Sequence, residues 1–431
     1  MSKDKLTDYD SSASNNSDVG GVNTAEGMLP SKVNDAIREL MSHLADFSAG
    51  TTGVDVLNLQ DDDNSASIKI QAPSEVTTTT TFTLPDGDGS AGQALLTDGA
   101  GALAWANPAS PNLIINGNMA ISQRGASSTG VSGGGYETVD RFRTAYNGTP
   151  DELRVTHAQV TDAPAGFSNS FKLTVTTPET TLATDERVRF QQRIEAFNLQ
   201  QLAFGTSSAL PITLSFYVKS SIAGTYGVDL KNSDAGRSAA QSYTISVADT
   251  WQKITLTFAG DTAGAFNNDN GEGLVVSWVL AAGTNYTSGT LATAFEATTN
   301  ANLAPSGQEN LIGTDNATWQ LTGVQLEVGN VGTAFQHESY AETLRKCQRF
   351  YQIGYVAATG RADGGTMGGA ATFATSMRAS ATMAVVSTAG AHYAGSPSLT
   401  GAAEGVTVTS PVNGTGNNAY RQIKFSAVAE L

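Results

Sequence analysis

The chain has 431 residues, which is long enough for two or three domains with at least one full hydrophobic core. Its formal net charge is −16 and no stretch concentrates Lys and Arg, which excludes a surface that follows a nucleic-acid backbone. A single cysteine excludes an internal disulfide and a cysteine-based zinc site. Only 15% of the residues are charged, and the 45 glycines favour short strands and tight turns over long helices.

No apolar run reaches the roughly 20 residues that a membrane-spanning helix needs. The opening residues MSKDKLTDYD also lack the apolar core of a signal peptide. We therefore expect a protein that is neither inserted into a membrane nor secreted by the standard route.

Residues 1–49 are predicted to form an attachment region. Residues 1–28 are polar and hold too few apolar groups to fold alone, so we expect a partner surface to hold this arm. A helix should begin at Pro30, because apolar side chains then recur at helical spacing. The positions of this apolar seam are Val33, Ile37, Leu40, Leu44 and Phe47. Two heptads are marginal for an isolated helix, which favours attachment or oligomerisation over a helix packed on its own domain.

Residues 50–111 contain short strand candidates separated by turn sequences. The candidates are 54–59, 67–72, 76–84 and 94–105. So few strands cannot bury a core within one chain, so we predict a short β shaft in which three chains intertwine. The acidic run DDDN at 61–64 is predicted to be a solvated turn, because it lacks the spaced ligands of a calcium loop. The glycine pattern at 87–92 is followed by a strand rather than a helix, so we expect no dinucleotide site there.

Residues 112–338 are predicted to form a jelly roll or β-sandwich. About ten strand candidates follow one another, the first at 112–121, and several of them alternate apolar and polar residues, as in ITLSFYVKS at 212–220. In the closing strand at 318–328 the apolar frame changes by one residue at Gly323. This change predicts a β-bulge at that glycine.

Residues 339–431 are predicted to form a capped helix followed by a C-terminal β-rich head. Ser339 with Glu342 three residues later is a capping box. The helix face expected to be buried carries Tyr340, Leu344, Cys347 and Tyr351. On this face Cys347 is expected to be a buried hydrophobe rather than a reactive thiol.

Three aromatic side chains of the head are candidates for glycan binding. They are His392, Tyr393 and Tyr420, and small residues of the Gly, Ser and Asn type flank them. A ring that stacks on a sugar, beside small hydrogen-bonding residues, is typical of carbohydrate sites. A purely structural role for the three rings is an equal alternative.

Several stretches of the chain share one family pattern. They are LPDGDGSAGQALLTDGAGALAW at 84–105, NLIINGNMAISQRG at 112–125, VDRF at 139–142, GVQLEVGNVGTAFQHESYAETLRKCQRFYQ at 323–352, and KFSAVAEL at 424–431. Together they resemble segments of bacteriophage tail fibre and tail appendage proteins. The 112–125 and 323–352 stretches are similar to the opening and the close of one domain in that family. The chain departs from the pattern at Met119 and Phe142, where the family usually carries an aromatic residue and Trp.

The resemblance implies a fold, partners and a location. Such domains are similar to carbohydrate-binding jelly rolls, and such proteins are homotrimeric components of the virion that are made in the host cytoplasm. By this resemblance the N-terminus docks on the phage tail or on an adaptor protein, and the distal domains bind a host surface polysaccharide. No cofactor is implied, apart from a structural calcium that such jelly rolls often hold between the opening and closing strands. Its candidate ligands here are Asn116 and Glu327.

No catalytic residues are predicted. HExxH and Walker A motifs are absent, no GxSxG nucleophile elbow is present, and the four histidines are scattered along the chain. Carboxylates such as Glu137, Asp140, Asp185 and Glu186 could cleave a sugar only if the fold placed two of them at the required separation. We therefore expect a binding protein rather than an enzyme. Two alternatives stay open: a virion-associated polysaccharide depolymerase, and an adaptor that carries another receptor-binding protein.

Overall fold

The computed structural model describes most of the chain from residue 111 onward, as 111–362, 364–413 and 416–431. The earlier described pieces are 8–10, 12–25, 27–48, 56–60, 67–71, 75, 81–87, 94–97 and 102–106. The chain separates into two compact units, Met1–Thr83 and Leu84–Leu431. This division falls inside the predicted shaft, and the predicted domain boundaries at 49, 111 and 338 stay predictions.

The first unit is built around one helix, α1 (Pro30–Ser48), at the place where the apolar spacing predicts it. Before it come a 3-10 turn, η2 (Ala13–Asn15), and a hairpin of β1 (Asp18–Val19) and β2 (Val22–Asn23). Both strands of this hairpin contact α1. After the helix, β3 (Val56–Gln60) and β4 (Ser67–Gln71) pair as an antiparallel hairpin, close to two of the predicted shaft strands.

In the rest of the predicted shaft, the observed strands differ from the predicted ones. The stretch predicted as one strand at 94–105 forms two paired strands, β5 (Ala94–Thr97) and β6 (Leu103–Ala106). Of the strand predicted at 76–84, residues 76–80 lie outside the described residues. Residues 81–84 are described and form no strand. The DDDN run at 61–64 lies outside the described residues.

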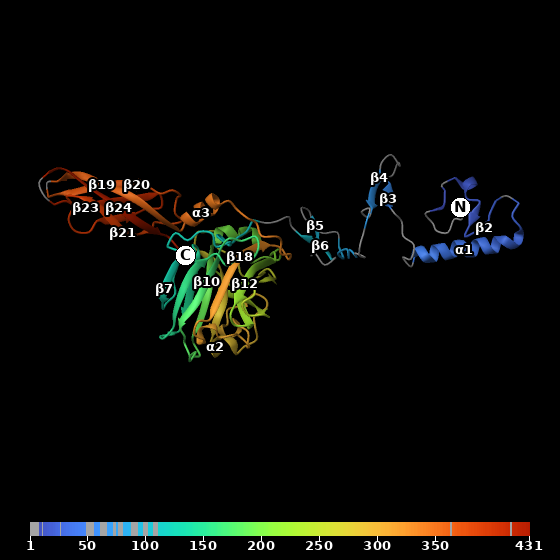
Figure 1. The fold of residues 1–431 in the computed structure, drawn as a ribbon, viewed down its shortest axis with the longest axis horizontal. Coiled ribbons are helices and arrows are strands. Elements are labelled where there is room, and N and C mark those ends of the chain that lie inside the picture. The colour runs from blue at the N-terminus through green and yellow to red at the C-terminus, as the bar shows by residue number, and fades with distance from the viewer. Residues whose placement is uncertain are drawn as a thin grey trace. The chain divides into compact units, whose positions relative to one another are not determined.

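The main domain is a β-sandwich of jelly-roll type with two six-stranded antiparallel sheets, which confirms the predicted fold class. The first sheet, called the β18 sheet below, has the order β15-β12-β18-β10-β9-β7, and Figure 1 shows β12, β18 and β10 side by side in it. The second, the β11 sheet, has the order β17-β14-β13-β16-β11-β8.

The β18 sheet consists of β7 (Ser127–Val131), β9 (Arg154–Val160), β10 (Ser170–Thr177), β12 (Ile212–Ser220), β15 (Gln252–Phe258) and β18 (Thr318–Val328). The β11 sheet consists of β8 (Phe142–Asn147), β11 (Arg187–Glu195), β13 (Gly224–Asn232), β14 (Arg237–Ile245), β16 (Glu272–Ala282) and β17 (Glu296–Ala297). The connections carry α2 (Thr284–Thr287), η3 (Ala196–Leu202), η4 (Asn300–Asn302) and η5 (Leu311–Gly313).

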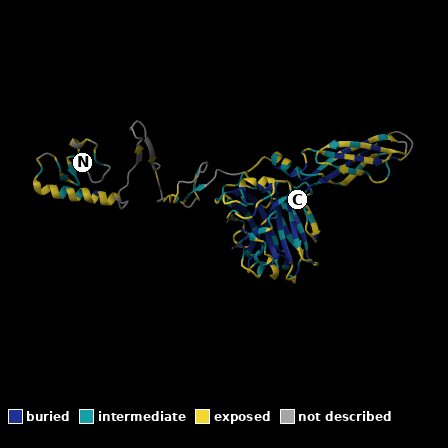
Figure 2. Cartoon of the chain, turned by 180° about the vertical axis from the view of Figure 1, so that it is seen from behind, coloured by how far each residue is buried: buried dark blue, intermediate teal, exposed yellow. Residues whose placement is uncertain are grey.

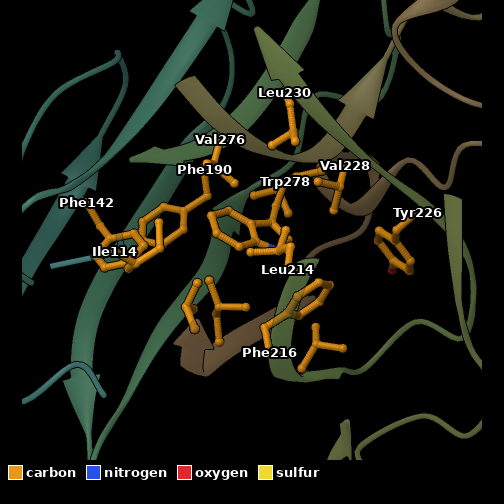
Figure 3. Packing of buried hydrophobic residues seen from close by; sticks show 14 of the residues in the cluster. Ile114, Phe142, Phe190, Leu214, Phe216, Tyr226, Val228, Leu230, Val276 and Trp278 are labelled. Carbon is orange, nitrogen blue, oxygen red and sulfur yellow. The ribbon is translucent and has the colours of Figure 1, made fainter. Parts of the chain in front are cut away.

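The space between the two sheets is filled by aromatic and aliphatic side chains from alternate strand positions. Figure 3 shows Phe142, Phe190, Phe216 and Trp278 gathered there, and all four are fully buried. The ring of Phe190 stacks on Phe171 with centroids 4.0 Å apart and on Phe142 at 5.3 Å. Burying one such side chain contributes about 1.5–3 kcal/mol, so this core holds the two sheets face to face.

The closing strand β18 carries the predicted bulge. On one side of a register shift Ser215 opposes Gln325, and on the other side Tyr217 opposes Thr322. One extra residue of β18 is therefore accommodated between these pairs. Gly323 lies there with φ +61°, a left-handed conformation that glycine adopts without steric cost.

The prediction of a strand at 112–121 is wrong. Turns replace it, because Asn116 and Met119 take positive φ values of 62° and 55°. The segment instead lies along the C-terminal half of β18 and is joined to it by backbone hydrogen bonds. The Leu113 N–H donates to the Leu326 carbonyl and the Val324 N–H donates to the Gly117 carbonyl, each at 2.9 Å.

The predicted helix cap is confirmed at α3 (Tyr340–Gln348), where the Glu342 N–H donates to the Ser339 hydroxyl at 3.3 Å. Cys347 is buried as predicted, and burial raises the pKa of its thiol well above the ordinary value. Tyr340 is 65% exposed, so its predicted place on the buried face is wrong. Among the described residues, no helix combines the length and the apolar character needed to span a bilayer.

The C-terminal region is one six-stranded sheet with the order β21-β24-β19-β20-β23-β22, as the predicted β-rich head requires. Its strands are β19 (Tyr351–Ala362), β20 (Thr366–Thr372), β21 (Thr382–Ala391), β22 (Ser398–Gly401), β23 (Gly405–Pro411) and β24 (Gly416–Val428). A small second core of Val356, Met367, Val408, Ile423 and Phe425 supports it. Figure 2 shows fewer buried residues in this sheet than in the sandwich.

Candidate functional site

The outer face of the β11 sheet is lined by long polar side chains. On β11 the residues Val188 and Phe190 turn into the core, and the alternation places Arg189, Gln191 and Arg193 on the opposite face. The strand register then sets a row of polar side chains across four strands. In this row Arg143 pairs with Gln191, Gln191 with Ser277, and Ser277 with Asp229.

These side chains border a groove with a volume of about 410 Å³, which we call the β11 groove. Its walls come from β8, β11, β13 and β16, with Gly134 at one margin. The lining residues that can donate a hydrogen bond to a ligand are Arg143, Tyr146, Arg189, Gln191, Arg193, Lys231 and Ser277. The groove therefore favours a ligand with many acceptor oxygens.

Partial burial leaves the guanidinium groups of the β11 groove short of solvation. Burial, with the neighbouring Arg187, lowers the pKa of Arg189 to about 10, and burial also lowers the pKa of Arg143, with a further contribution from Arg193. Both guanidinium groups stay charged at neutral pH. A ligand carboxylate or phosphate would restore part of the stabilisation that these cations lose by burial.

Two buried donors at this face have no hydrogen-bond partner among the described residues. They are Nε of Arg189 and the hydroxyl of Tyr146. Burial raises the pKa of Tyr146, so its hydroxyl keeps its proton and remains a donor. A buried donor without a partner costs about 1–3 kcal/mol, which water or a ligand oxygen would offset.

The two carboxylates of the β11 groove are already paired. Asp229 forms an ion pair with the buried Arg187, whose guanidinium also lies over the Tyr286 ring at 5.3 Å. Glu272 forms an ion pair with Arg193 at 2.9 Å and accepts a hydrogen bond from the Ser233 hydroxyl at 2.6 Å. Acids held in this way favour binding over sugar cleavage, which needs a carboxylate free to transfer a proton and a second one to act as nucleophile or base.

The predicted glycan-binding residues of the head lie near one end of its sheet. Ala391 pairs with Tyr420 across β21 and β24, so His392 and Tyr393 follow directly from that pair. Tyr420 is 54% exposed, whereas the Tyr393 ring is covered by the Arg421 guanidinium at 4.1 Å. His392, Tyr393 and Tyr420 therefore lie near one another at this end of the sheet. Their role in glycan binding stays a prediction.

The candidate calcium ligands both use their oxygens within the protein. The Asn116 side chain accepts from the Ile121 N–H at 2.9 Å and donates to the Ile121 and Asp140 carbonyls. The Glu327 carboxylate accepts from the Thr333 N–H at 2.8 Å and from its hydroxyl at 2.6 Å. Within the described part of the chain, no group of three or more His, Cys, Asp or Glu side chains is placed to hold a metal ion. The calcium site stays a prediction.

Sequence reasoning missed the β11 groove, although one signal for it is present. The stretch RVRFQQRIE at 187–195 carries Arg or Gln at four successive alternate positions, which a strand displays on a single face. The partners that complete the row, Arg143 and Ser277, depend on the order of strands in the sheet. That order is not visible in the local pattern.

No protein-family model matches the chain, and no curated protein sequence matches it. Solved structures with partial similarity include the enzymatically active domain of bacteriophage CBA120 tailspike protein 4, at 14% identity and a TM-score of 0.27. That match covers 50% of this chain and 21% of the tailspike domain.

A family 11 carbohydrate-binding module from Clostridium thermocellum matches at 12% identity and a TM-score of 0.25, over 48% of this chain and 98% of the module. The CBM22-1 xylan-binding domain of Xyn10C from Paenibacillus barcinonensis matches at 10% identity and a TM-score of 0.25, over 52% of this chain and 98% of that domain. Values this low establish no relationship.

Proposed function

We propose that the chain is a structural component of a bacteriophage virion, a homotrimeric tail fibre or appendage. Its N-terminal region docks on the tail or on an adaptor protein, and its distal domains bind a host surface glycan without cleaving it. The observation that carries this proposal is that the stretches resembling tail appendage proteins, which lie far apart in the sequence, interlock in space.

The opening and closing stretches meet at β18 and at the start of β19. The Asn112 side chain donates to the Val324 carbonyl at 3.0 Å and accepts from the Leu326 N–H at 3.0 Å. The Gln123 side chain donates to the Tyr351 carbonyl at 2.8 Å. The resemblance thus rests on residues that contact one another, which is what a shared structural unit requires.

Cation–π contacts join the stretches at 112–125 and 139–142 to the closing stretch at 323–352. The Arg124 guanidinium lies 3.7 Å from the centre of the Tyr351 ring, and the Arg141 guanidinium lies 3.4 Å from the centre of the Phe350 ring. The ending of the chain belongs to this junction as well, because the Glu430 carboxylate pairs with both arginines. Arg124, Arg141, Phe350, Tyr351 and Glu430 all belong to the stretches that resemble the family, so four of its five stretches meet at this junction.

The β11 groove supports glycan binding as the activity. A polysaccharide offers dense hydroxyl and ring oxygens, and many bacterial surface polymers also carry carboxylate or phosphate groups. The groove supplies donors without partners and partly buried cations, which suit such acidic sugars. One such site binds weakly, and three copies in one fibre raise the effective concentration enough to hold a cell.

The packing of α1 supports self-association. The N-terminal arm covers the polar side of the helix, where the Tyr9 hydroxyl forms a 2.7 Å hydrogen bond with Nδ1 of the buried His43. The apolar seam of Val33, Ile37, Leu40, Leu44 and Phe47 is left 40–52% exposed, and Figure 2 colours most of α1 as exposed. Seams with this heptad spacing pack on copies of themselves, so we assign the seam to the two sister chains of a trimer.

The test uses the purified full chain on an array of capsular polysaccharides and lipopolysaccharides from different bacteria. We expect selective retention on polymers that carry acidic sugars, weakened by salt, with no new reducing ends in the supernatant. Retention on no polymer of the array would overturn the proposal. Release of new reducing ends would replace it with the depolymerase alternative.

A further inference from the structure

The outer face of the β18 sheet, on the other side of the sandwich, carries a group of aromatic rings around a hollow. Phe167 comes from the connection between β9 and β10, Tyr217 from β12, and Phe335 and His337 from the segment between β18 and α3. The Phe167 ring centre lies 5.4 Å from Tyr217, 5.0 Å from Phe335 and 5.3 Å from His337. These rings border a hollow of about 370 Å³, which we call the Phe167 pocket.

The bulge in β18 makes room for this pocket. A Cβ atom at Gly323 would lie 2.7 Å from the Phe167 ring and 2.9 Å from the Tyr217 ring. Because such distances are too short for carbon atoms, only glycine lets the two rings approach the strand at this point. The predicted bulge therefore also provides a surface without a side chain, against which the two aromatic rings pack.

The segment that carries Phe335 and His337 is held in place by Gln325 of β18. The Gln325 amide donates to the Thr333 hydroxyl at 3.1 Å and accepts from the Gln336 N–H at 2.8 Å. The Glu327 carboxylate binds the same segment at Thr333. The rings are thus positioned before any ligand arrives, which lowers the entropy cost of binding.

Three polar groups at the Phe167 pocket have no hydrogen-bond partner among the described residues. They are the Tyr217 hydroxyl, the Lys253 ammonium and the His337 imidazole, and all three belong to the pocket lining. Aromatic faces beside unpaired donors fit a pyranose ring, whose C–H face stacks while its hydroxyls form hydrogen bonds. Lys253 is the single cation of the lining, and no carboxylate lines the pocket.

We propose that the Phe167 pocket is a second saccharide site, specific for neutral sugar rings and separate from the β11 groove. This inference rests on the proposed function, because it assumes that the chain binds glycans at all. The two sites lie on the outer faces of opposite sheets, so one jelly roll can engage a neutral and an acidic part of a surface polymer at once.

The test places the full chain on an array that carries neutral O-antigen polysaccharides beside capsular polysaccharides with uronic acids. The pocket variant is Tyr217→Phe with His337→Ala, which removes two free polar groups and leaves the core rings in place. The matched groove variant is Arg143→Ala with Lys231→Ala. Circular dichroism and thermal unfolding confirm that each variant is folded.

We expect the pocket variant to lose about tenfold in affinity for neutral polymers, which corresponds to about 1.4 kcal/mol, with acidic polymers unaffected. The groove variant should show the reverse. If neutral polymers are retained equally by wild type and pocket variant, or are not retained by the wild type, the second site is overturned while retention of acidic polymers keeps the proposed function. If wild type retains neither class, the proposed function fails first.

Discussion

The carboxylate of Glu430 is bound by the guanidinium of Arg141, which lies 289 residues earlier in the chain. The Arg141 side chain is 1% exposed and that of Glu430 is 6% exposed, so both charges are buried. Arg141 also donates to the Arg193 carbonyl at 2.6 Å and lies against the Phe350 ring. One ion pair therefore joins the sandwich, the start of the head and the last residues of the chain.

Replacing Glu430 by Gln should destabilise this junction strongly. Arg141 would keep a buried charge without its carboxylate, and breaking a buried pair costs about 3–5 kcal/mol. We expect the loss in the free energy of unfolding measured with urea. The matched control is Glu338→Gln, since the Glu338–Lys346 pair is 39% and 33% exposed and such pairs contribute about 0–1 kcal/mol. Equal stability of the two variants would show that the junction does not depend on this pair.

Asp140 gives the junction a pH dependence. Burial raises its pKa to about 6, against hydrogen bonds from Gln123 and the charge of Arg124, which lower it. Between its unfolded pKa near 4 and its folded pKa, the folded state binds more protons than the unfolded state, so this group's contribution to stability falls as pH rises. The total loss is about 2–3 kcal/mol and is complete above pH 6.

The measurement compares wild type with Asp140→Asn from pH 4 to pH 7. Asparagine cannot ionise, so the wild-type stability relative to the variant should decline with rising pH across that window. His157 titrates in the same range, because burial lowers its pKa to about 4, but it is present in both proteins and cancels in the difference. A difference that does not vary with pH would contradict the assignment to Asp140.

The calcium prediction for Asn116 and Glu327 has a direct thermal test. A bound ion stabilises the folded state by mass action, so calcium should raise the melting temperature of the full chain and a chelator should reverse the rise. Glu327→Gln should abolish the calcium-dependent part of the shift, whatever its effect on the basal value. An unchanged melting temperature in wild type would contradict the calcium prediction. Asn116 and Glu327 would then serve only through their hydrogen bonds to Ile121 and Thr333.

Local patterns in the sequence were sufficient for the features that depend on neighbouring residues. The frame change at Gly323 identified the bulge, and the spacing of Ser339 and Glu342 identified the cap of α3. The turn at 112–121 was not predicted, because its apolar residues suit a strand, while the positive φ of Asn116 accompanies a side-chain hydrogen bond to the carbonyl of Asp140, 24 residues away.

The candidate sites depend on long-range arrangement and were therefore not predictable from periodicity. Arg143, Gln191 and Ser277 become neighbours only through the order of β8, β11 and β16. The rings of Phe167, Tyr217 and Phe335 come from three separate segments. Sequence reasoning identified the glycine at the bulge but not the rings that contact it, and it missed the polar face of β11.

The exposed apolar seam of α1 predicts that the protein is a trimer in solution. Placing a carboxylate at its centre with Ile37→Glu would bring several like charges together between apolar helices, so the trimer should dissociate. Sedimentation equilibrium should give three chain masses for wild type and one for the variant. Arg38→Glu, at an exposed position beside the seam, is the control and should stay trimeric. A wild-type protein that is monomeric at micromolar concentration, or an Ile37→Glu variant that keeps three chains, would contradict the assignment of this seam to sister chains.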